Sequence, residues 1–473
     1  MVRFESLRDW ITFLEQQGDL ARNKEEVNIW GDISAISRKI ARTDGPAVLH
    51  ENIEGYPGWR VFSDGLTTRR RQLWTLDVPA EGALQITLDK LKGGKPAKPV
   101  IVEQAPCKEI KLFGDDIDLV KFPIAFTGEM EAAPHITAGI SFIQDPETGW
   151  INAGIRRFQL AGRDKLFNLV LPFQQEAMIF RKYQRMGKPA PIAIPIGIDP
   201  VACFCCMMPA PAQFDEADNF PIFTGEPLKA VKCETSDIIV PATSEIVIEG
   251  EMDPVEVELE GPFPEFPGYY SALRLCPVIK VKAITMRSNP IYQFMYMGVP
   301  PSEGHNTGAF TYEIELFRQL KSLVPEVADV GVLSTWSLTI AVSLNKSMVR
   351  PGLDKKLATA VKAVDAGRMV KNVFIVDDYV DVHNVHEVLW SMSVKFQPEK
   401  DFLMVPETAG ILLDPSETVI GPGFGYSGLS SFGVFNCLEK LPPYNEGFKR
   451  GLATPPIEAS KRVDENWSKY MGK

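Results

Sequence analysis

The sequence predicts a chain of several domains that mixes α/β regions with an all-β region. Its 473 residues exceed what one compact core usually holds, which favours two or three domains. From about residue 113 to residue 300, many short β-like runs are separated by proline and glycine, a pattern typical of a barrel or sandwich. The buried-strand run VFIVDD at 373–378 is followed by a helical pattern, so this later region is again predicted as α/β.

The N-terminal region, residues 1–112, is expected to be α/β. Residues 6–17 are predicted to form a helix, because Ser6 can cap its start, an apolar stripe runs along it and Gly18 ends it. The segment 93–99, rich in glycine, proline and lysine, marks the predicted end of this region. Further expected elements are a helix near 31–42, strands at 47–49 and 59–62, and at 69–71 a solvated helix start in preference to an anion site.

The central region, residues 113–310, is expected to hold the barrel or sandwich, and residues 311–450 the second α/β domain. A helix at 312–323 leads into that second domain. The residues from 451 to 473 read as an amphipathic arm, which we expect to pack on a partner subunit. The expected central strands are 136–143, 150–160, 166–171, 193–198, 238–240, 245–249 and 278–286, with a helical insert at 176–186 and a later helix at 385–396.

Composition excludes several classes of function. A net charge of −11 argues against a nucleic-acid partner, because phosphate binding needs a basic surface. No apolar run reaches the length of a membrane span, and charged Arg3 and Glu5 interrupt any signal-peptide pattern, so we expect a cytoplasmic protein. The seven cysteines are expected to be reduced thiols. Cys203, Cys205 and Cys206 lie in an apolar run and are expected to be buried rather than metal-bound.

The stretch VEVELEGPFPEFPGYY, residues 255–270, carries two acids of interest. Strict alternation up to Glu260 puts valine and leucine on one strand face and the glutamates on the other. Glu265 follows between prolines and phenylalanines, an apolar and stiff setting that favours a protonated carboxyl, as a general acid requires. Taken alone, the stretch is better explained as a solvated strand face followed by a polar turn residue.

Common catalytic motifs are missing from the sequence. There is no Gly-rich phosphate loop, no HExxH pattern and no Gly-x-Ser-x-Gly elbow. The histidines are His50, His135, His305, His383 and His386. The pair three residues apart, His383 and His386, is predicted to lie on a helix surface rather than to bind a metal.

Other polar segments accompany the acidic stretch. The predicted strand at 150–160 carries Asn152 and Arg157, and a bulge at Gly154 would turn both side chains toward one cavity. An acidic loop carries Glu216, and the segment KCETSDIIVPATSEIVIEG comes shortly before the two glutamates. Together, these polar segments make a functional site the better interpretation of residues 255–270.

The ordered set NAGIRR, the Glu216 loop, KCETSD, VPATSE, EGPFPE and GYY resembles the UbiD-like decarboxylases that use prenylated flavin mononucleotide (FMN). FESLRDWITFLEQQGDL, GPAVLHENIEGYPGWRVFSDGLTTRRR and VKNVFIVDDYVDVHNVHEVLW agree with the same family in the same order. The resemblance covers about residues 4–415. It implies a split β-barrel that binds the flavin, placed between an N-terminal α/β region and a C-terminal α/β domain joined by a helix.

The resemblance also implies the chemistry. Its catalytic Glu-Arg-Glu trio matches Glu260, Arg157 and Glu265. Removing CO2 from an aromatic, heteroaromatic or α,β-unsaturated acid leaves a carbanion that needs an electron sink, which the modified flavin provides. Arg157 would fix a carboxylate while Glu260 orients the guanidinium, and Glu265 would return the proton. The reaction can be reversible.

A metal site is implied as well. Its ligands match Asn152 and Glu216, where Mn2+ or Mg2+ bridges the flavin phosphate to the protein and K+ often lies nearby. The usual third ligand is a histidine, and the segment LPFQQEA places Gln174 or Gln175 there instead. An amide oxygen can bind a hard cation, so the departure bears on affinity more than on the existence of the site.

The remaining matches concern the cofactor, the substrate and the assembly. Ile155 and Met208 are implied flavin contacts, Lys371 matches the lysine that reaches the cofactor phosphate, and His305 falls on the substrate-side wall. The family receives its cofactor from a UbiX-like flavin prenyltransferase, and a homodimer or larger homo-oligomer is expected. The usual Gly-x-Asp-Ala-Thr-like stretch is not recognisable after Gly421.

Two other functions remain open. The missing histidine is compatible with a non-catalytic paralogue that binds ordinary flavin or serves as an assembly factor. The second alternative is a flavin-dependent reductase built on a split barrel. Such an enzyme would oxidise a nicotinamide cofactor, for which the sequence offers no site. The sequence names neither the substrate nor the physiological direction.

Overall fold

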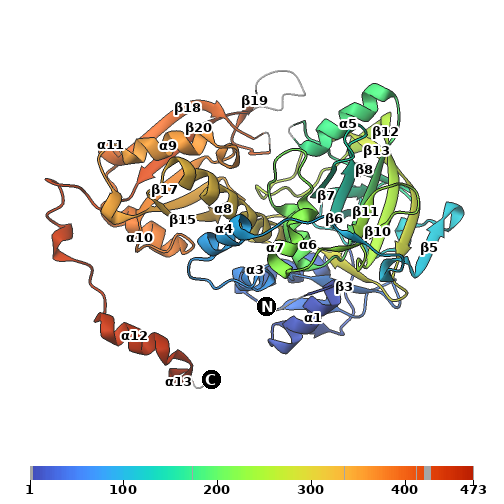
Figure 1. Cartoon of the computed structure of the whole chain (residues 1–473), viewed down its shortest axis with the longest axis horizontal. Helices are drawn as coiled ribbons and strands as arrows, with labels where there is room; N and C mark the ends of the chain where they lie inside the picture. Colours follow the sequence, from blue (N-terminus) through green and yellow to red (C-terminus); the bar gives the residue numbers. More distant parts are fainter. Residues whose placement is uncertain (1–3, 173, 335, 412, 420–427, 472–473) are drawn as a thin grey trace.

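The computed structural model describes residues 4–172, 174–334, 336–411, 413–419 and 428–471. The predicted fold class is confirmed: a β-barrel lies between an N-terminal α/β region and a C-terminal α/β domain. Figure 1 shows the barrel strands in green and yellow, with the first region in blue and the last in orange. Within these described ranges, none of the helices combines the length and the apolar composition that a membrane crossing requires.

The N-terminal region packs helices on a four-stranded sheet with strand order β1-β2-β3-β14. The first helix begins as predicted, because the Ser6 hydroxyl accepts a hydrogen bond from the backbone N–H of Asp9 at 3.3 Å. Strand β14 follows the barrel in the chain and pairs with β3, so this sheet joins the two regions. The elements are α1 (Leu7–Gln16), β1 (Leu20–Asn23), α2 (Asp32–Thr43), β2 (Ala47–His50), β3 (Arg60–Ser63), α3 (Arg69–Leu76), α4 (Ala83–Gly93) and β14 (Ile291–Phe294).

The basic cluster at the start of α3 is only partly solvated. The helix does begin at Arg69, but the expectation of a solvated cluster is wrong for Arg71, whose side chain is fully buried. Arg71 Nη2 pairs with Asp19 Oδ1 at 2.8 Å, and its Nη1 donates to the backbone carbonyl of Asp64. A buried guanidinium is tolerated because these oxygens replace its hydration.

Six antiparallel strands form the barrel in the order β12-β9-β6-β7-β8-β13, and pairing of β12 with β13 closes it. One buried apolar cluster receives side chains from all six strands and forms the barrel core. Strand β5 pairs with β13 as an added strand. The bounds are β5 (Ile110–Phe113), β6 (His135–Gln144), β7 (Ile151–Leu160), β8 (Lys165–Asn168), β9 (Ala190–Ile196), β12 (Ile246–Glu260) and β13 (Arg274–Met286).

The predicted bulge at Gly154 is wrong. The register shift lies in β6, between Ile136 and Gly139, so that two residues of β6 face Arg157 of β7. Gly154 instead leaves room for a neighbouring side chain, because a Cβ atom there would lie 2.9 Å from Arg156 Nη1. The bulge therefore lies in β6, opposite Arg157, and not in β7 between Asn152 and Arg157.

Shorter elements surround the barrel. Three strands form a separate sheet: β4 (Val100–Ile101), β10 (Lys229–Lys232) and β11 (Ile239–Pro241). The helices are α5 (Gln175–Met186), α6 (Pro200–Met207) and α7 (Phe220–Thr224).

All seven cysteines are free and buried, including the three on α6, as predicted. The 3₁₀ turns of the chain are Pro106–Lys108, Gly114–Asp116, Leu119–Lys121, Glu216–Asn219, Lys346–Met348, Asp365–Gly367 and Phe448–Arg450.

The C-terminal domain contains a sheet with strand order β15-β16-β17-β20-β18, with β19 paired to β20. Its core is split by the sheet: α8 and α9 contribute to one buried cluster and α10 to another. The elements are α8 (Glu303–Leu323), β15 (Val327–Ser334), β16 (Thr339–Leu344), α9 (Leu353–Ala363), β17 (Asn372–Asp377), α10 (Val385–Lys395), α11 (Pro398–Asp401), β18 (Phe402–Ala409), β19 (Thr418–Val419) and β20 (Gly428–Asn436). The Gly-x-Asp-Ala-Thr-like stretch of the family is not recognisable after Gly421, and residues 420–427 lie outside the described residues.

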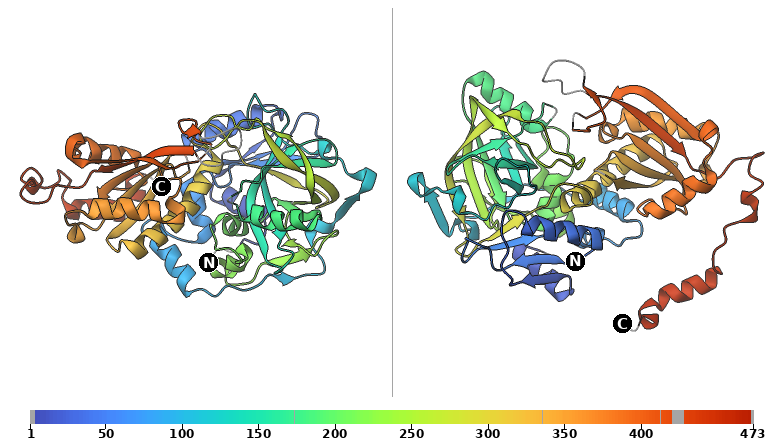
Figure 2. Two further views of the ribbon diagram at one scale, coloured as in Figure 1. Left: turned by 90° about the horizontal axis from the view of Figure 1, so that it is seen from above. Right: turned by 180° about the vertical axis from the view of Figure 1, so that it is seen from behind.

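The chain ends in an arm that leaves the body of the molecule. Two helices lie on it, α12 (Ile457–Glu465) and α13 (Trp467–Tyr470), and neither buries a residue. The red arm stands apart from the orange domain both in Figure 1 and in the view from behind in Figure 2.

Candidate active site

The structure brings the predicted trio together beside β7. Arg157 projects from β7, Glu260 is the last residue of β12, and Glu265 lies in the loop that follows. The guanidinium binds Glu260 with two hydrogen bonds, from Nε to Oε1 at 2.7 Å and from Nη2 to Oε2 at 3.1 Å. Arg157 Nη1 donates to Glu265 Oε1. Two buried carboxylates therefore share one cation, and the contact of Glu265 with Arg157 was not predicted from its apolar neighbours.

Electrostatics fix the ionisation of Glu260. Burial alone would raise the pKa of Glu260, but the positive charges of Arg157 and His135 outweigh it and lower this pKa to about 2. The same carboxylates raise the pKa of Arg157 further above its usual value, against the effect of burial. The ring of Phe263 lies 4.6 Å from the guanidinium carbon and adds a cation–π contact.

The loop that carries Glu265 is held at several points. Gly261 has φ of 100°, a backbone conformation that favours glycine, and its N–H donates to Gln159 Oε1 at 2.9 Å. The N–H of Phe263 donates to Ser271 Oγ at 3.0 Å, and the N–H of Glu265 donates to the carbonyl of Tyr269 at 2.9 Å. Glu265 is thus placed by the backbone rather than by a flexible loop.

The predicted metal ligands meet near the start of β7. Asn152 Nδ2 donates to Glu216 Oε1 at 2.9 Å and to Gln175 Oε1 at 3.1 Å. Glu216 comes from a 3₁₀ turn and Gln175 from the first turn of α5. Gln174, the alternative candidate, instead accepts a hydrogen bond from the N–H of Leu171. The contacts therefore favour Gln175 over Gln174 as the third ligand.

The donor set at Asn152 fits a hard cation. Glu216 is buried, and among the described residues its carboxylate receives the amides of Asn152 and Ala153 but no cationic side chain. Burial raises the pKa of Glu216 to about 7. A divalent cation would balance this charge, and all the candidate ligand atoms are oxygens. No cluster of three His, Cys, Asp or Glu suited to a metal occurs in the described ranges, so the site depends on amide ligands.

Other predicted residues lie outside these two clusters. Ile155 and Met208 are half-buried against the same large apolar cluster. Lys371, on the C-terminal domain, pairs with Asp414 at 2.7 Å. Its predicted reach to a cofactor phosphate remains a prediction.

His305 supports the Glu265 loop. Its Nε2 lies 2.5 Å from the backbone carbonyl of Phe266, and its Nδ1 lies 2.5 Å from Ser302 Oγ. Burial lowers the pKa of His305, which favours the neutral ring, and the two contacts suit the tautomer in which Nε2 donates to the carbonyl and Nδ1 accepts from the hydroxyl. Both ring nitrogens are engaged by protein groups, which makes His305 a support for the loop that carries Glu265.

The prediction of a helix surface holds for only one of the two neighbouring histidines. His386 is exposed on α10, as predicted. The prediction is wrong for His383, which lies before α10 and places its Nδ1 3.3 Å from Glu313 Oε1. The His383 side chain is therefore held in an ion-pair contact with the buried carboxylate of Glu313 on α8.

Two groups near the trio were missed by sequence reasoning. His135 opens β6 fully buried, with Nε2 3.3 Å from Glu260 Oε1, and Glu131 approaches its other ring nitrogen. Arg156, the neighbour of Arg157, pairs with buried Glu176 of α5 at 2.8 Å and so ties α5 to the barrel. The sequence does show Glu131 four residues before His135, which suggests that these two side chains could interact. It does not show that His135 also lies beside Glu260 of β12.

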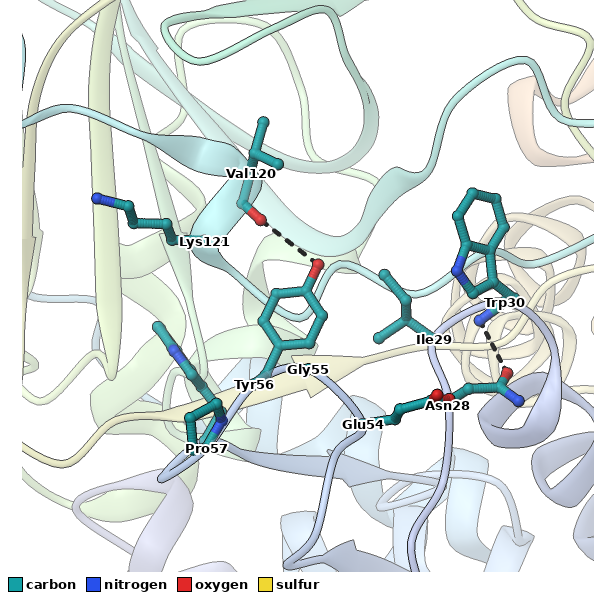
Figure 3. Close-up of a pocket in the computed structure, with 10 residues that line it drawn as sticks. Asn28, Ile29, Trp30, Glu54, Gly55, Tyr56, Pro57, Val120 and Lys121 are labelled. Carbon is teal, nitrogen blue, oxygen red and sulfur yellow. Dashed lines mark hydrogen bonds between the residues drawn. The ribbon is translucent and has the colours of Figure 1, made fainter.

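A separate pocket of about 620 Å³ lies between loops of the N-terminal region and the segment before the barrel. Figure 3 shows Tyr56 at its centre, with the hydroxyl donating to the carbonyl of Val120 at 3.4 Å. Trp30 and Lys121 also line it. None of its lining residues belongs to the trio or to the candidate metal site, so this pocket does not bear on the chemistry above.

Sequence profiles of one protein family match most of the chain. Three sequence profiles of 3-octaprenyl-4-hydroxybenzoate carboxy-lyase (UbiD) match: the N-terminal domain over 11–91, the Rift-related domain over 98–300 and the C-terminal domain over 305–426. A phenolic acid decarboxylase of Sedimentibacter hydroxybenzoicus is 31% identical over 479 residues, which cover 96% of this chain and 95% of that protein.

Solved structures show the same likeness over the whole chain. The UbiD-class enzyme HmfF from Pelotomaculum thermopropionicum, in complex with FMN, superposes with a TM-score of 0.86 at 30% identity, covering 97% of this chain and 99% of that chain. An evolved dimeric form of HmfF in complex with prenylated FMN gives 0.83 at 29%, covering 97% and 98%. Vanillic acid decarboxylase of S. hydroxybenzoicus, at 29% identity, gives 0.88 in its open form, covering 99% and 100%, and 0.83 in its closed form, covering all of both chains.

Proposed function

Because the chain belongs to the UbiD family of carboxy-lyases, we propose that it carries out reversible, non-oxidative decarboxylation of an aromatic, heteroaromatic or α,β-unsaturated carboxylic acid with prenylated FMN. The observation that carries this proposal is the buried Arg157 bound by two carboxylates, one of them ionised at all ordinary pH values. The relatives named phenolic and vanillic acid decarboxylases support an aryl acid as the first class to test.

Arg157 has capacity left for a substrate. A guanidinium carries five N–H donors, and within the described part of the chain three of them are used, two on Glu260 and one on Glu265. The remaining two N–H groups can bind and orient the substrate carboxylate. Glu260 keeps the guanidinium aligned because its two oxygens hold Nε and Nη2 at once. When bound, prenylated FMN supplies the electron sink for the carbanion that CO2 leaves.

Glu265 is the proposed proton donor. Only its Oε1 is held by Arg157, and no protein group among the described residues donates to its Oε2. That oxygen can carry a proton to the carbon that loses CO2 and recover it from solvent in the next cycle. In the direction of carboxylation, the same oxygen would accept the proton.

We assign the cofactor contacts as follows. Asn152, Gln175 and Glu216 would hold Mn2+ or Mg2+ beside the flavin phosphate, with K+ nearby, because their ligand atoms are hard oxygens. The remaining proposed flavin contacts are Ile155, Arg157, Gln174, Met208 and Lys371. His305 would act on the substrate side through the loop that follows Glu265. The prenylated cofactor would come from a UbiX-like flavin prenyltransferase.

A non-catalytic flavin-binding paralogue or assembly factor is the second candidate. Gln175 in place of the usual histidine is the observation that favours it, since a weaker metal site could leave the cofactor poorly held. The intact set of Glu260, Arg157 and Glu265 argues for catalysis, because a binding protein has no use for three buried charges.

Release of CO2 tests the proposed function. The protein is purified from a host that expresses a flavin prenyltransferase and from a host that lacks one, and each preparation is assayed on aryl, heteroaryl and acrylic acids. We expect turnover of at least one acid by the first preparation alone, because the protein itself offers no electron sink. Absence of turnover with prenylated flavin bound would favour the non-catalytic alternative, and full activity without it would exclude the proposed chemistry.

A further inference from the structure

A buried histidine continues the trio on the far side of Glu260. The side chains of His135 and Glu131 are both completely shielded from solvent. His135 Nε2 lies 3.3 Å from Glu260 Oε1, and His135 Nδ1 lies 3.8 Å from Glu131 Oε1. The Glu260 oxygen near His135 is the one that accepts the hydrogen bond from Arg157 Nε at 2.7 Å. The charged groups thus form one row of five: Glu131, His135, Glu260, Arg157 and Glu265.

The geometry around the imidazole favours its cationic form. Each nitrogen of His135 faces a glutamate oxygen at an ion-pair distance, although neither contact has the geometry of a hydrogen bond. Two negative charges on opposite sides of the ring favour its protonated, cationic form. The Phe263 ring, whose centroid is 4.7 Å from that of His135, presents a second surface suited to a cation.

The charge of the row leads to the same conclusion. With Glu131 and Glu260 ionised, two carboxylates are balanced by Arg157 and protonated His135. Loss of the histidine proton would leave one cation for these two carboxylates, and Glu265 adds a third negative charge whenever it is ionised. Such an imbalance is costly in a site shielded from water. Burial lowers the pKa of His135, but Glu131 and Glu260 outweigh burial, and the pKa of His135 lies above its ordinary value.

We propose that His135, held as an imidazolium by Glu131, is a positioning residue for the proposed decarboxylation: it fixes the Glu260 carboxylate that aligns Arg157. The inference rests on the proposed function for its effect on turnover. His135 touches neither substrate nor flavin in this assignment, since it acts through Glu260. The alkaline limb of activity would then report loss of the His135 proton, which weakens the hold on Glu260.

Neighbouring groups do not offer an alternative titration. On β13, burial and the charge of Glu260 raise the pKa of the Cys276 thiol to about 12, so the thiol stays neutral. Arg274 lies opposite Glu260 in the register of β12 and β13. Among the described residues, the charges that raise the pKa of His135 are those of Glu131 and Glu260.

Nitrogen-15 spectra of the histidines test the charge without any assay of turnover. The holo-protein is labelled at its histidine rings, and the His135 signals are assigned by their loss in His135→Gln. We expect both ring nitrogens of His135 to be protonated at pH 7.5. In Glu131→Gln, we expect the titration of His135 to move to lower pH. A neutral His135 at pH 7.5 in the unaltered protein would overturn the proposal, whatever the activity.

Steady-state kinetics test the positioning. His135→Gln should lower kcat on the order of tenfold to a hundredfold through misalignment of Arg157, with unchanged flavin content. Glu131→Gln should shift the alkaline limb of the kcat/KM profile to lower pH, an effect that a merely structural role would not produce. His386→Gln, on the exposed face of α10, is the matched control and should leave both unchanged.

The outcomes separate the two proposals. If the unaltered protein turns over none of the acids, the proposed function fails, and the histidine spectra still decide the charge of His135. If His135→Gln does not fold, Glu131→Gln and the spectra decide. Unchanged kcat in folded His135→Gln, or an unmoved alkaline limb in Glu131→Gln, would overturn the role of His135.

Discussion

At the scale of single residues, Glu260 and Glu265 differ in the number of hydrogen bonds that they accept from Arg157, and this difference separates their roles. Arg157 donates two hydrogen bonds to Glu260, which stays ionised, but one to Glu265, and no described residue donates to Glu265 Oε2. A fixed anion suits orientation, and a carboxyl with a free oxygen suits proton transfer. The sequence predicted these three residues through the order of its motifs. It could not predict that Glu265 also reaches Arg157, because that contact joins residues 108 positions apart.

His135 shows the limit of motif reasoning at this scale. A buried histidine is recognisable in a sequence only when its partners are near in the chain or the spacing is one of a known motif. Here the decisive partner, Glu260, lies on another barrel strand. The bulge beside Arg157 was misplaced for a similar reason, since the register of β6 depends on its partner strand.

Glu216→Ala tests the metal assignment. Removing the only candidate ligand with a negative charge should weaken metal binding by at least about tenfold and reduce the flavin bound with it. Metal analysis and the flavin absorption of purified protein measure both quantities. Glu147→Ala, an exposed acid on the β6–β7 turn, is the control and should keep both. Wild-type stoichiometry of metal and flavin in the Glu216 variant would show that the assignment is wrong.

At the scale of elements, an ionic network joins the N-terminal region to the C-terminal domain. Arg69 on α3 pairs with Glu313 of α8, and Glu313 also faces His383, which lies before α10. Burial lowers the pKa of His383, as does the charge of Arg69, but Glu313 and Asp329 raise it to about 9. The pKa of Glu313 falls to about 2, because Arg69 and His383 outweigh its burial.

The network predicts a loss of stability in alkaline solution. Because the pKa of His383 is higher in the folded state, its contribution is complete below its unfolded value of about 6.5 and disappears as the pH rises through about 9. His383→Gln should therefore lower Tm near pH 6, on the order of 1–2 °C, and have no effect near pH 10. Thermal unfolding of both proteins from pH 6 to 10 measures the difference, with His386→Gln as control. A difference that grows with pH would contradict this account.

The elements themselves were predicted where local signals were strong. The Ser6 cap and the stripe of α1 gave its bounds to within a residue, and α5 and α10 were equally well defined by periodicity. Strand β12 was predicted at both ends, but its apolar face is exposed: Val255 is 81% accessible. Alternation identifies a strand and its two faces, yet only the fold decides which face is covered.

At the scale of the whole molecule, the barrel supplies the trio and the candidate metal ligands, while Lys371 lies on the C-terminal domain. The arrangement of domains followed from the family resemblance. The pairing of β14 with β3 could not be predicted from the sequence. A strand that follows the barrel and completes the N-terminal sheet has no local sequence signal.

The arm supports a proposed homo-oligomer. Ile457 and Trp467 are 70% and 57% exposed on helices that bury nothing within the described part of this chain. Short helices gain most of their stability from packing, so a second copy is the natural surface for them. Sedimentation velocity measures the state directly.

The most direct test of the central claim, that Glu265 returns the proton beside Arg157 and Glu260, is hydrogen exchange in heavy water. The unaltered protein with prenylated FMN should exchange product hydrogen for deuterium at the carbon that bore the carboxylate. Glu265→Gln, with its flavin content verified, should lose this exchange by on the order of a hundredfold to ten-thousandfold, because an amide cannot cycle the proton. Exchange by Glu265→Gln at the wild-type rate would contradict the account and place the proton on another group.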